Sequence, residues 1–234
     1  MQIIKFKTNS DMRIKFLDKH GYETNTTYEN FKKGTIKNPY DPSVFGYGYL
    51  GEGGYKTMIN KVTTKEYQVW NNLIARCYSE KQRKLHKAYG DCEICEEWHN
   101  FQTFAKWFNE NYYTIPNERV ELDKDILIKG NRLYSPDTCL FVPQTINLLF
   151  VNRRNYRGND SLGVRKTKSG KYTVTLGCNK KIKHLGHFKT SEEAFQCFKV
   201  HKEAHVREMA EKYKSLIPKL VYQALYKYQF EITD

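Results

Sequence analysis

The sequence predicts an α+β fold made of three modules that follow one another along the chain. Short alternating segments bounded by glycine and asparagine predict strands near both ends, and apolar residues at helical spacing predict the helices. We expect a small β-rich module over residues 1–62 and a central module with supporting helices over residues 63–152. Over residues 158–234, a three-stranded antiparallel sheet is expected to pack on a long helix, with further C-terminal helix after it.

The composition indicates a globular chain of a reducing cytoplasm. Its 234 residues are enough for one large domain or two to three small ones, and the mean hydropathy is −0.76. No segment approaches the roughly 18 apolar residues of a membrane span, so we expect no membrane partner. The first residues lack the apolar core of a secretion signal, and six cysteines in this length do not form a disulfide framework.

Positive charge is concentrated towards the C-terminus. The net charge is +13, and residues 153–234 carry +10 of it, from eighteen basic and eight acidic residues. Between Arg153 and His187 there are ten basic residues and one acid, Asp160. A basic patch this local predicts a polyanionic partner, most simply nucleic acid. The alternative is a solvated surface without a partner.

The N-terminal module is predicted to contain strands over Met12–Phe16 and Gly21–Tyr28. Residues 44–56 then combine five glycines with four aromatic residues. We favour turns and bulges in a compact β unit for this segment. The alternative is a flexible loop whose tyrosines stack on bases.

Two amphipathic helices are predicted to support the central module. The segment Thr63–Glu66 fits a capping box that opens the first of them. Its buried face is expected to consist of Tyr67, Trp70, Leu73, Ile74, Cys77 and Tyr78. The second helix is expected to begin near Asn100, with a buried side of Phe101, Phe104, Ala105 and Phe108.

The stretch Leu122–Phe150 is predicted to form a strand, a tight turn over residues 129–131, a second strand and a helix. Strand alternation places Asp123 and Asp125 on one face, with Cα atoms roughly 7 Å apart, and Asn147 falls on the helix. Oxygen ligands at such a corner suit a hard divalent cation. The alternative is that these side chains cap the turn and the helix start.

Three strands are predicted between Leu162 and Phe188, followed by a helix over Ser191–Tyr213 and a last helix over Lys219–Tyr228. In the middle strand, apolar residues share one face, which the long helix is expected to cover. The other face is expected to present hydrogen-bond donors from Lys171, Thr173, Thr175 and Lys183.

Four motifs in this region occur in an order and at a spacing that are typical of one type of DNA-binding domain. They are Gly163-Val164-Arg165, Gly170-Lys171-Tyr172, Leu185-Gly186-His187-Phe188, and Thr190 with Glu193-Ala194. With them, the region from Gly163 to about Tyr213 resembles the APETALA/ethylene-response-factor type of DNA-binding domain. This type also occurs in phage and mobile-element nucleases. The resemblance implies that the sheet lies in the major groove of double-stranded DNA, backed by the helix.

The resemblance implies that Arg165 contacts a DNA base. It does not transfer a sequence preference, because Ser169 and His184 replace two tryptophans of the plant pattern and Thr167 replaces an arginine. Lysine and arginine near phosphate would add affinity that depends on salt but not on sequence. We expect the DNA-binding residues to be Arg153, Arg154, Arg157, Arg165, Lys168, Lys171, Thr173, Thr175, Lys181, Lys183 and His184.

A second set of motifs lies between Tyr67 and Val151: Arg76-Cys77-Tyr78, Ile94-Cys95 with Trp98, Leu122-Asp123-Lys124, Gly130-Asn131, Tyr134-Ser135-Pro136, Thr138-Cys139 and Asn147. In these motifs the chain resembles a variant subgroup of phage HNH-like (ββα-metal) endonucleases. The resemblance implies an HNH-like ββα-metal centre with one divalent ion, Mg²⁺ or Mn²⁺. Its expected metal ligands are Asp123 and Asn147, and its expected catalytic residues are Asp123, Lys124, Asp125 and Asn131.

Lys124 stands where the family has the histidine that acts as general base. A lysine with an ordinary pKa near 10.4 is protonated at pH 7 and does not accept a proton from water. Thr138 also replaces the asparagine that orients the base. Three roles for Lys124 therefore stay open. It is a base made neutral by burial, or a cation that positions the scissile phosphate while Asp125 helps to bind metal or water, or part of a nuclease fold retained for binding.

The cysteines allow a structural zinc site as an alternative to core packing. Cys92 and Cys95 have the spacing of a zinc ligand pair, and Cys77 and Cys139 would complete four thiolates. The spacing does not form two such pairs, and Cys77 falls on an apolar helix face. We therefore favour small core residues over a zinc site.

These observations together predict a metal-dependent DNA endonuclease of phage or mobile-element origin, of nicking or homing type, in the host cytoplasm if phage-encoded. The alternative is a catalytically degenerate DNA-binding protein that acts as a regulator or counter-defence factor. An RNA-directed enzyme is the third interpretation. The polar sheet has few aromatic residues for stacking single-stranded bases, which favours duplex DNA.

Overall fold

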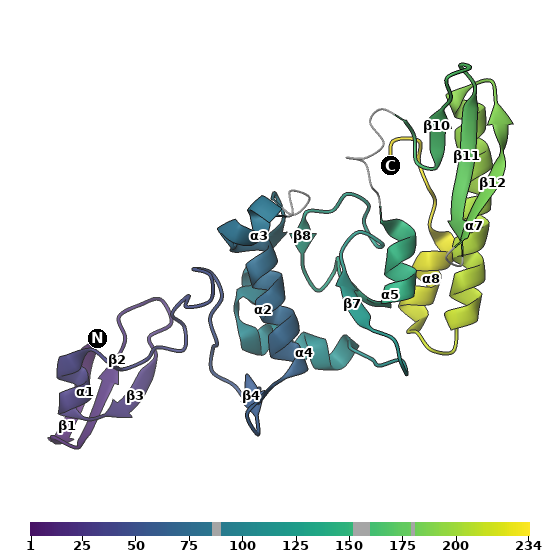
Figure 1. Cartoon of the computed structure of the whole chain (residues 1–234). Helices are drawn as coiled ribbons and strands as arrows, with labels where there is room; N and C mark the ends of the chain where they lie inside the picture. Colours follow the sequence, from purple (N-terminus) through teal and green to yellow (C-terminus); the bar gives the residue numbers. More distant parts are fainter. Residues whose placement is uncertain (86–89, 152–159, 179–180) are drawn as a thin grey trace. The chain divides into compact units, whose positions relative to one another are not determined.

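The chain has a mixed α+β fold, as predicted, with several small sheets and helices of different lengths (Figure 1). No helix within the described ranges is both long enough and apolar enough to cross a membrane. The computed structural model describes residues 1–85, 90–151, 160–178 and 181–234.

The chain forms two compact units. Unit 1 consists of residues 1–111 and 132–137, and unit 2 consists of residues 112–131 and 138–234. Each unit is therefore assembled from segments that are separated in the sequence.

Unit 1 begins with a three-stranded antiparallel sheet in the order β1-β2-β3. Met12 and Ile14 alternate with exposed residues along the middle strand and are almost fully buried, so the sheet has one apolar face. Strand β1 is an edge strand that the sequence pattern did not indicate, since all of its side chains are exposed. The elements are β1 Gln2–Thr8, β2 Asp11–Lys15, β3 Glu23–Thr26 and α1 Tyr28–Lys33.

The helical part of unit 1 packs α2 against α4 through the apolar faces that the sequence predicts. Trp70 Nε1 donates a hydrogen bond of 2.7 Å to the carbonyl of Trp98 in this core. A Cβ on Gly48 would lie 2.9 Å from the Trp70 ring, so the glycine-rich segment packs closely on α2. The elements are β4 Met58–Ile59, β5 Val62–Thr63, α2 Lys65–Tyr78, α3 Glu80–Leu85, β6 Glu93–Ile94, η2 Glu96–His99, α4 Phe101–Asn111 and β8 Leu133–Tyr134, which pairs with β6.

Helix α2 does not use the predicted capping box. Its N-cap residue is Thr64 rather than Thr63, and the Thr64 side chain makes no capping bond. The Thr64 hydroxyl instead donates to the carbonyl of Lys56 at 2.8 Å, because the β4–β5 hairpin brings that carbonyl next to it.

Unit 2 contains an antiparallel strand pair followed by short helices. Strand β7, Val120–Asp123, pairs with β9, Leu140–Pro143, so that Asp123 lies opposite Leu140. The predicted tight turn over residues 129–131 does not join this pair, because the whole connection 124–139 lies between the two strands. The helices that follow are α5 Gln144–Asn147 and η3 Leu148–Phe150.

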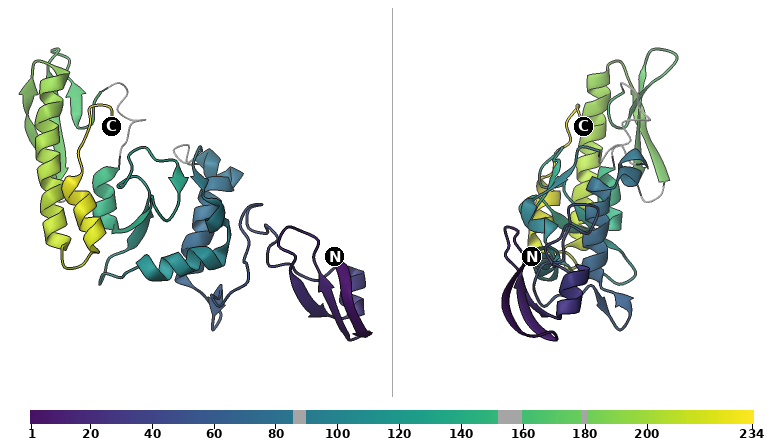
Figure 2. Two further views of the ribbon diagram at one scale, coloured as in Figure 1. Left: turned by 180° about the vertical axis from the view of Figure 1, so that it is seen from behind. Right: turned by 90° about the vertical axis from the view of Figure 1, so that its left-hand side faces the viewer.

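The C-terminal part of unit 2 is an antiparallel sheet in the order β10-β11-β12, with α7 along one face (Figure 2). Val174 and Leu176 of the middle strand are buried against this helix, together with Phe195 and Phe198. Thr190 and Glu193 form the predicted capping box at the start of α7. The elements are β10 Val164–Lys166, β11 Tyr172–Cys178, β12 Lys181–Phe188, α7 Ser191–Tyr213 and α8 Lys219–Lys227.

One core joins the β7–β9 pair to the C-terminal sheet within unit 2. The Glu118 carboxylate accepts hydrogen bonds from the Thr145 N–H at 2.9 Å and from the Tyr213 hydroxyl at 2.8 Å. The rings of Phe150 and Phe230 stack 6.2 Å apart. These contacts connect α5 and η3 to α7 and the final residues, so the two units divide the chain differently from the three predicted modules.

Candidate functional site

The acidic corner lies at the end of β7. Asp123 Oδ1 accepts hydrogen bonds from the N–H groups of Asp125 at 2.9 Å and Ile126 at 2.8 Å. A side chain that satisfies the next backbone donors in this way ends a strand and starts a turn. The expectation that Asp125 continues the strand and shares the face of Asp123 is therefore wrong.

Glu121 is the acid that shares the strand face of Asp123. The two residues are two positions apart in β7, so their side chains project to the same side of the strand. Asn147 Nδ2 donates a hydrogen bond of 2.9 Å to Glu121 Oε2. The predicted metal ligand Asn147 thus reaches the acidic face, but its hydrogen-bond partner is Glu121. The two-residue spacing in the sequence was the signal that could have identified Glu121.

The surroundings of Asp123 make its charge costly. Burial raises the pKa of this carboxyl above its ordinary value of 3.8, although the two backbone N–H donors act in the opposite direction. Among the described residues, Asp123 Oδ2 accepts no hydrogen bond. A half-buried carboxylate with one oxygen still available is the kind of group that a bound cation stabilises.

The donor set at this corner fits one magnesium or manganese ion. Asp123 and Glu121 offer carboxylate oxygens, and Asn147 offers an amide oxygen, which are the ligands that these ions prefer. Within the described ranges, no group of three or more His, Cys, Asp and Glu side chains is placed to hold a metal. Asn147 would be the third protein ligand of such an ion, and water molecules would complete its coordination.

Burial of the Asp123 charge predicts a stability that depends on pH and on metal. Because the folded-state pKa lies above the ordinary value, the contribution of Asp123 to stability is fully present below its unfolded-state pKa and is lost as the pH rises through the folded-state pKa. Asp123→Asn should therefore raise the urea midpoint at pH 7 in EDTA, and the difference should disappear near pH 3. Mg²⁺ should raise the midpoint of the wild type and leave that of the variant unchanged. An equal response of both proteins to Mg²⁺ would place the ion elsewhere.

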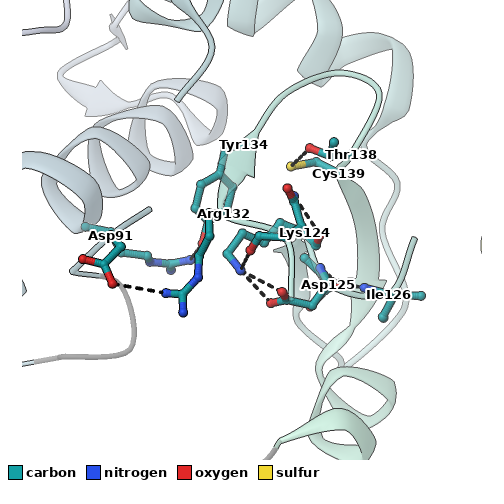
Figure 3. Close-up of polar contacts among 11 residues, drawn as sticks. Asp91, Lys124, Asp125, Ile126, Arg132, Tyr134, Thr138 and Cys139 are labelled. Carbon is teal, nitrogen blue, oxygen red and sulfur yellow. Dashed lines mark hydrogen bonds and ion pairs between the residues drawn. The ribbon is translucent and has the colours of Figure 1, made fainter. Parts of the chain in front are cut away.

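Lys124 is buried and its ammonium group is held in an ion pair (Figure 3). It donates to both carboxylate oxygens of Asp125, at 2.8 and 2.9 Å, and to the carbonyl of Asn131 at 2.5 Å. Asn131 Nδ2 returns a hydrogen bond of 3.0 Å to the Lys124 carbonyl. These contacts hold Lys124, Asp125 and Asn131 together within the connection that follows β7. The Asp125 carboxylate and the Asn131 carbonyl both stabilise a positive charge on the Lys124 side chain, so the geometry favours a cationic role for Lys124 over that of a base.

Removal of the Lys124 ammonium should lower stability. The Lys124 side chain is 8% exposed, whereas that of Asp125 is 48% exposed and can regain water. We expect Lys124→Met to cost about 1–3 kcal/mol in urea unfolding, since the Asn131 carbonyl loses its buried donor. Lys129→Met is the matched control, because the Lys129 side chain also forms an ion pair, with Asp234, but is itself 32% exposed. Unchanged stability of Lys124→Met together with lost cleavage would instead identify Lys124 as a reacting group.

The last described residues also contribute to this corner. Lys129 Nζ lies 5.1 Å from the centre of the Tyr228 ring and 2.9 Å from Asp234 Oδ2. Burial raises the pKa of Tyr228, and the negative charges of Asp234, Asp123 and Asp125 raise it further. The Tyr228 hydroxyl is therefore a neutral donor close to the acids. The sequence carried no sign of this contact, because about a hundred residues separate its two sides.

A second candidate region is the outer face of the C-terminal sheet, on the side opposite α7. Arg165, Thr173 and His187 lie side by side across the three strands, and Thr175 lies opposite His184. Thr173 Oγ1 is 3.3 Å from His184 Nδ1, and the rings of His184 and His187 are 4.8 Å apart. The predicted residues Arg165, Thr173, Thr175 and His184 thus form one polar face, to which the structure adds His187.

The other predicted DNA-binding residues lie around this face or away from it. Lys168 and Lys171 are exposed at the turn between β10 and β11. Lys181 and Lys183 are paired with Cys178 and with the buried Leu176, so they project from β12 towards the α7 side. The expectation that Lys183 shares the outer face is wrong, because a bulge in the β11–β12 register between residues 174 and 175 changes which β12 side chains face outwards. The remaining three, Arg153, Arg154 and Arg157, lie outside the described residues.

The positive charge of this sheet is not neutralised within the described chain. The basic side chains of the sheet and its turns are Arg165, Lys166, Lys168, Lys171, Lys181 and Lys183. Within the described residues, none of them forms an ion pair with a carboxylate. Elsewhere in the chain, basic side chains commonly do so, as Arg13 does with Glu23 and Lys33 with Glu29. The sheet therefore presents charge that is available to an external polyanion.

The cysteines of the described residues form no disulfide bond. Cys77, Cys92 and Cys139 are buried, and Cys95 is half-buried with a pKa that burial raises. Burial among apolar neighbours is the ordinary environment of a cysteine that packs in a core.

Comparison with known proteins provides no external assignment. No family model, curated protein or solved structure matches this chain.

Proposed function

We propose that this protein is an HNH-like endonuclease that binds duplex DNA with its C-terminal sheet and cleaves it with one Mg²⁺ or Mn²⁺ ion. The observation that supports this most is the content of unit 2. It combines an acidic, partly desolvated oxygen corner with a sheet whose positive charge is not neutralised within the described residues. A cation site and a polyanion-binding surface in one compact unit suit phosphodiester chemistry.

The outer face of the sheet would be the part that holds DNA. The major groove is wide enough to admit β-strands, and arginine, threonine and histidine side chains can donate to base edges or phosphates there. Arg165 lies in the first strand of the cross-strand row, next to Thr173. The lysines at the surrounding turn would add affinity that falls with salt.

Asp123, Glu121 and Asn147 would hold the divalent ion. Such an ion, when bound, stabilises the negative charge that builds up on a phosphate during hydrolysis. Lys124 would act as a positioning residue, since its ion pair with Asp125 and its bond to Asn131 shape the connection beside the ligands. Tyr228 would supply a neutral hydroxyl donor at the same corner.

One observation favours a second candidate, a DNA-binding protein without cleavage activity. The position of the family's general base is occupied by Lys124, whose ammonium is held by Asp125 and the Asn131 carbonyl. A regulator or counter-defence factor would need the cationic sheet to bind DNA but would not need a general base.

An assay on supercoiled plasmid distinguishes the two candidates. We expect relaxed or linear product in Mg²⁺ or Mn²⁺ and none in EDTA. Salt-sensitive binding to duplex DNA without product under any metal would support the binding-only protein. A clear preference for RNA over duplex DNA in competition would contradict both.

A further inference from the structure

The β4–β5 hairpin of unit 1 carries three apolar side chains into solvent. Met58 is 52% exposed, Ile59 is 55% exposed and Val62 is 69% exposed. Met58 pairs with Thr63 and Ile59 pairs with Val62, so these side chains are carried by a paired hairpin. Figure 1 shows the hairpin projecting from the start of α2. Ile59 and Val62 project to one face of the hairpin and Met58 to the other, because successive residues of a strand alternate. Single exposed apolar residues are ordinary, but apolar side chains on both faces of one short projection indicate a contact site.

The base of this hairpin is held rigidly. Thr64 donates to the carbonyl of Lys56 at 2.8 Å through its hydroxyl and to that of Thr57 at 3.0 Å through its N–H. Gln102 of α4 accepts from the Tyr55 N–H at 2.9 Å and donates to the Tyr55 carbonyl at 3.0 Å. The two strands that carry the apolar side chains are therefore ordered before any partner binds, which lowers the entropy cost of association.

The charged residues of the hairpin itself are all lysines, and the nearest acids along the chain are Glu52 and Glu66. Residues 54–65 contain Lys56, Lys61 and Lys65 and no acidic residue. All three lysines are exposed, and none forms an ion pair within the described chain. Asn60 and Lys61 both have positive φ, at 49° and 65°, as a two-residue hairpin turn requires. Glycine would be less strained than lysine at the second position, so the turn carries a cation at a conformational cost.

We propose that this hairpin is a wedge that inserts the cross-strand pair Ile59 and Val62 between base pairs from the minor groove of duplex DNA, with Met58 in contact from the opposite face. Aliphatic side chains are the usual wedges of minor-groove proteins, and flanking lysines pair with the phosphates on either side. Aromatic residues would be expected instead for stacking on single-stranded bases. The inference rests on the proposed function, because DNA is the polyanion that the C-terminal sheet is proposed to bind.

Unwinding of a plasmid tests the wedge without knowledge of a target site. Relaxed plasmid is incubated with the full chain and a metal-independent topoisomerase in EDTA, which prevents the proposed cleavage. Insertion between base pairs unwinds DNA, so we expect the wild type to change the linking number. The triple variant Met58→Ser/Ile59→Thr/Val62→Thr should lose this change. The affinity of this variant for duplex DNA should fall by about tenfold at most. The loss of apolar contacts is offset because the variant no longer has to break the stacking of neighbouring base pairs.

Leu17→Ser is the matched control, since Leu17 is 70% exposed elsewhere in unit 1. It should change the linking number as the wild type does. The wedge is overturned, and the proposed function stands, if the wild type binds DNA without unwinding or if the triple variant unwinds normally. An equal loss of unwinding in Leu17→Ser also overturns the wedge. So does a triple variant that unwinds DNA normally but no longer binds anionic phosphatidylserine vesicles. Absence of any DNA binding by the wild type rejects the proposed function itself.

Discussion

Asp123→Asn is expected to lower metal-dependent DNA cleavage by at least about a thousandfold, because removal of a ligand charge weakens ion binding and stabilisation of the transition state. Asparagine retains an oxygen at the position of Asp123 Oδ1, which accepts the N–H groups of Asp125 and Ile126. The turn after β7 should therefore keep its shape, and DNA affinity in EDTA should stay within about twofold of the wild type. Nicking of supercoiled plasmid over a range of Mg²⁺ concentrations measures the first effect, and a salt-controlled binding titration measures the second.

Two further variants make this result specific. Asp137→Asn removes an exposed acid from the same connection between β7 and β9 and should leave cleavage unchanged. Glu121→Gln keeps an oxygen for Asn147 Nδ2 but removes a ligand charge, so it should raise the Mg²⁺ concentration needed for half-maximal cleavage by about tenfold. Full activity of Asp123→Asn would reject the metal site at this corner.

Arg165→Glu should weaken binding to duplex DNA by about a hundredfold at moderate salt. The substitution replaces an attractive charge on the outer face with a repulsive one, next to Thr173 in the cross-strand row. Each lost phosphate contact should also reduce the slope of log affinity against log salt by about one. Fluorescence anisotropy at several salt concentrations measures both quantities.

Lys183→Glu is the control for Arg165→Glu, because it makes the same change of charge on the same sheet. Lys183 is paired with the buried Leu176 and projects towards the α7 side, so its reversal should cost no more than about tenfold. Equal losses for the two variants would mean that the overall charge of the sheet, and not its outer face, determines binding.

Most of the regular structure of the C-terminal sheet followed from local patterns. Tyr172, Val174 and Leu176 alternate with polar residues, and Thr190 and Glu193 form a capping box, so each signal lies within a few residues of the structure that it specifies. The buried faces of α2 and α4 were predictable for the same reason. Patterns of this kind arise because one side of an element must be apolar to be buried.

The arrangement of the candidate site was less accessible to sequence reasoning. The positions of Asp123 and Asn147 were identified, but the end of β7 depends on which backbone donors the Asp123 side chain accepts. The contact of Asn147 with Glu121 depends on the pairing of β7 with β9, which local turn signals did not indicate. Hydrogen bonds of this kind are chosen among competing local partners once the strands have packed.

The sequence by itself determined the α+β class, the cationic character of the C-terminal sheet and the acidic residues beside Lys124, because composition and periodicity are local properties. Only the tertiary structure decided that Lys124 is held in an ion pair with Asp125, that Tyr228 and Asp234 lie at the same corner, and that Lys183 leaves the outer face. The contacts of Tyr228 and Asp234 with Lys129 join residues about a hundred positions apart, so packing of the whole unit governs them. The side of Lys183 depends on the β11–β12 register, and the pair between the neighbours Lys124 and Asp125 depends on the end of β7 at Asp123, neither of which the local sequence pattern specifies.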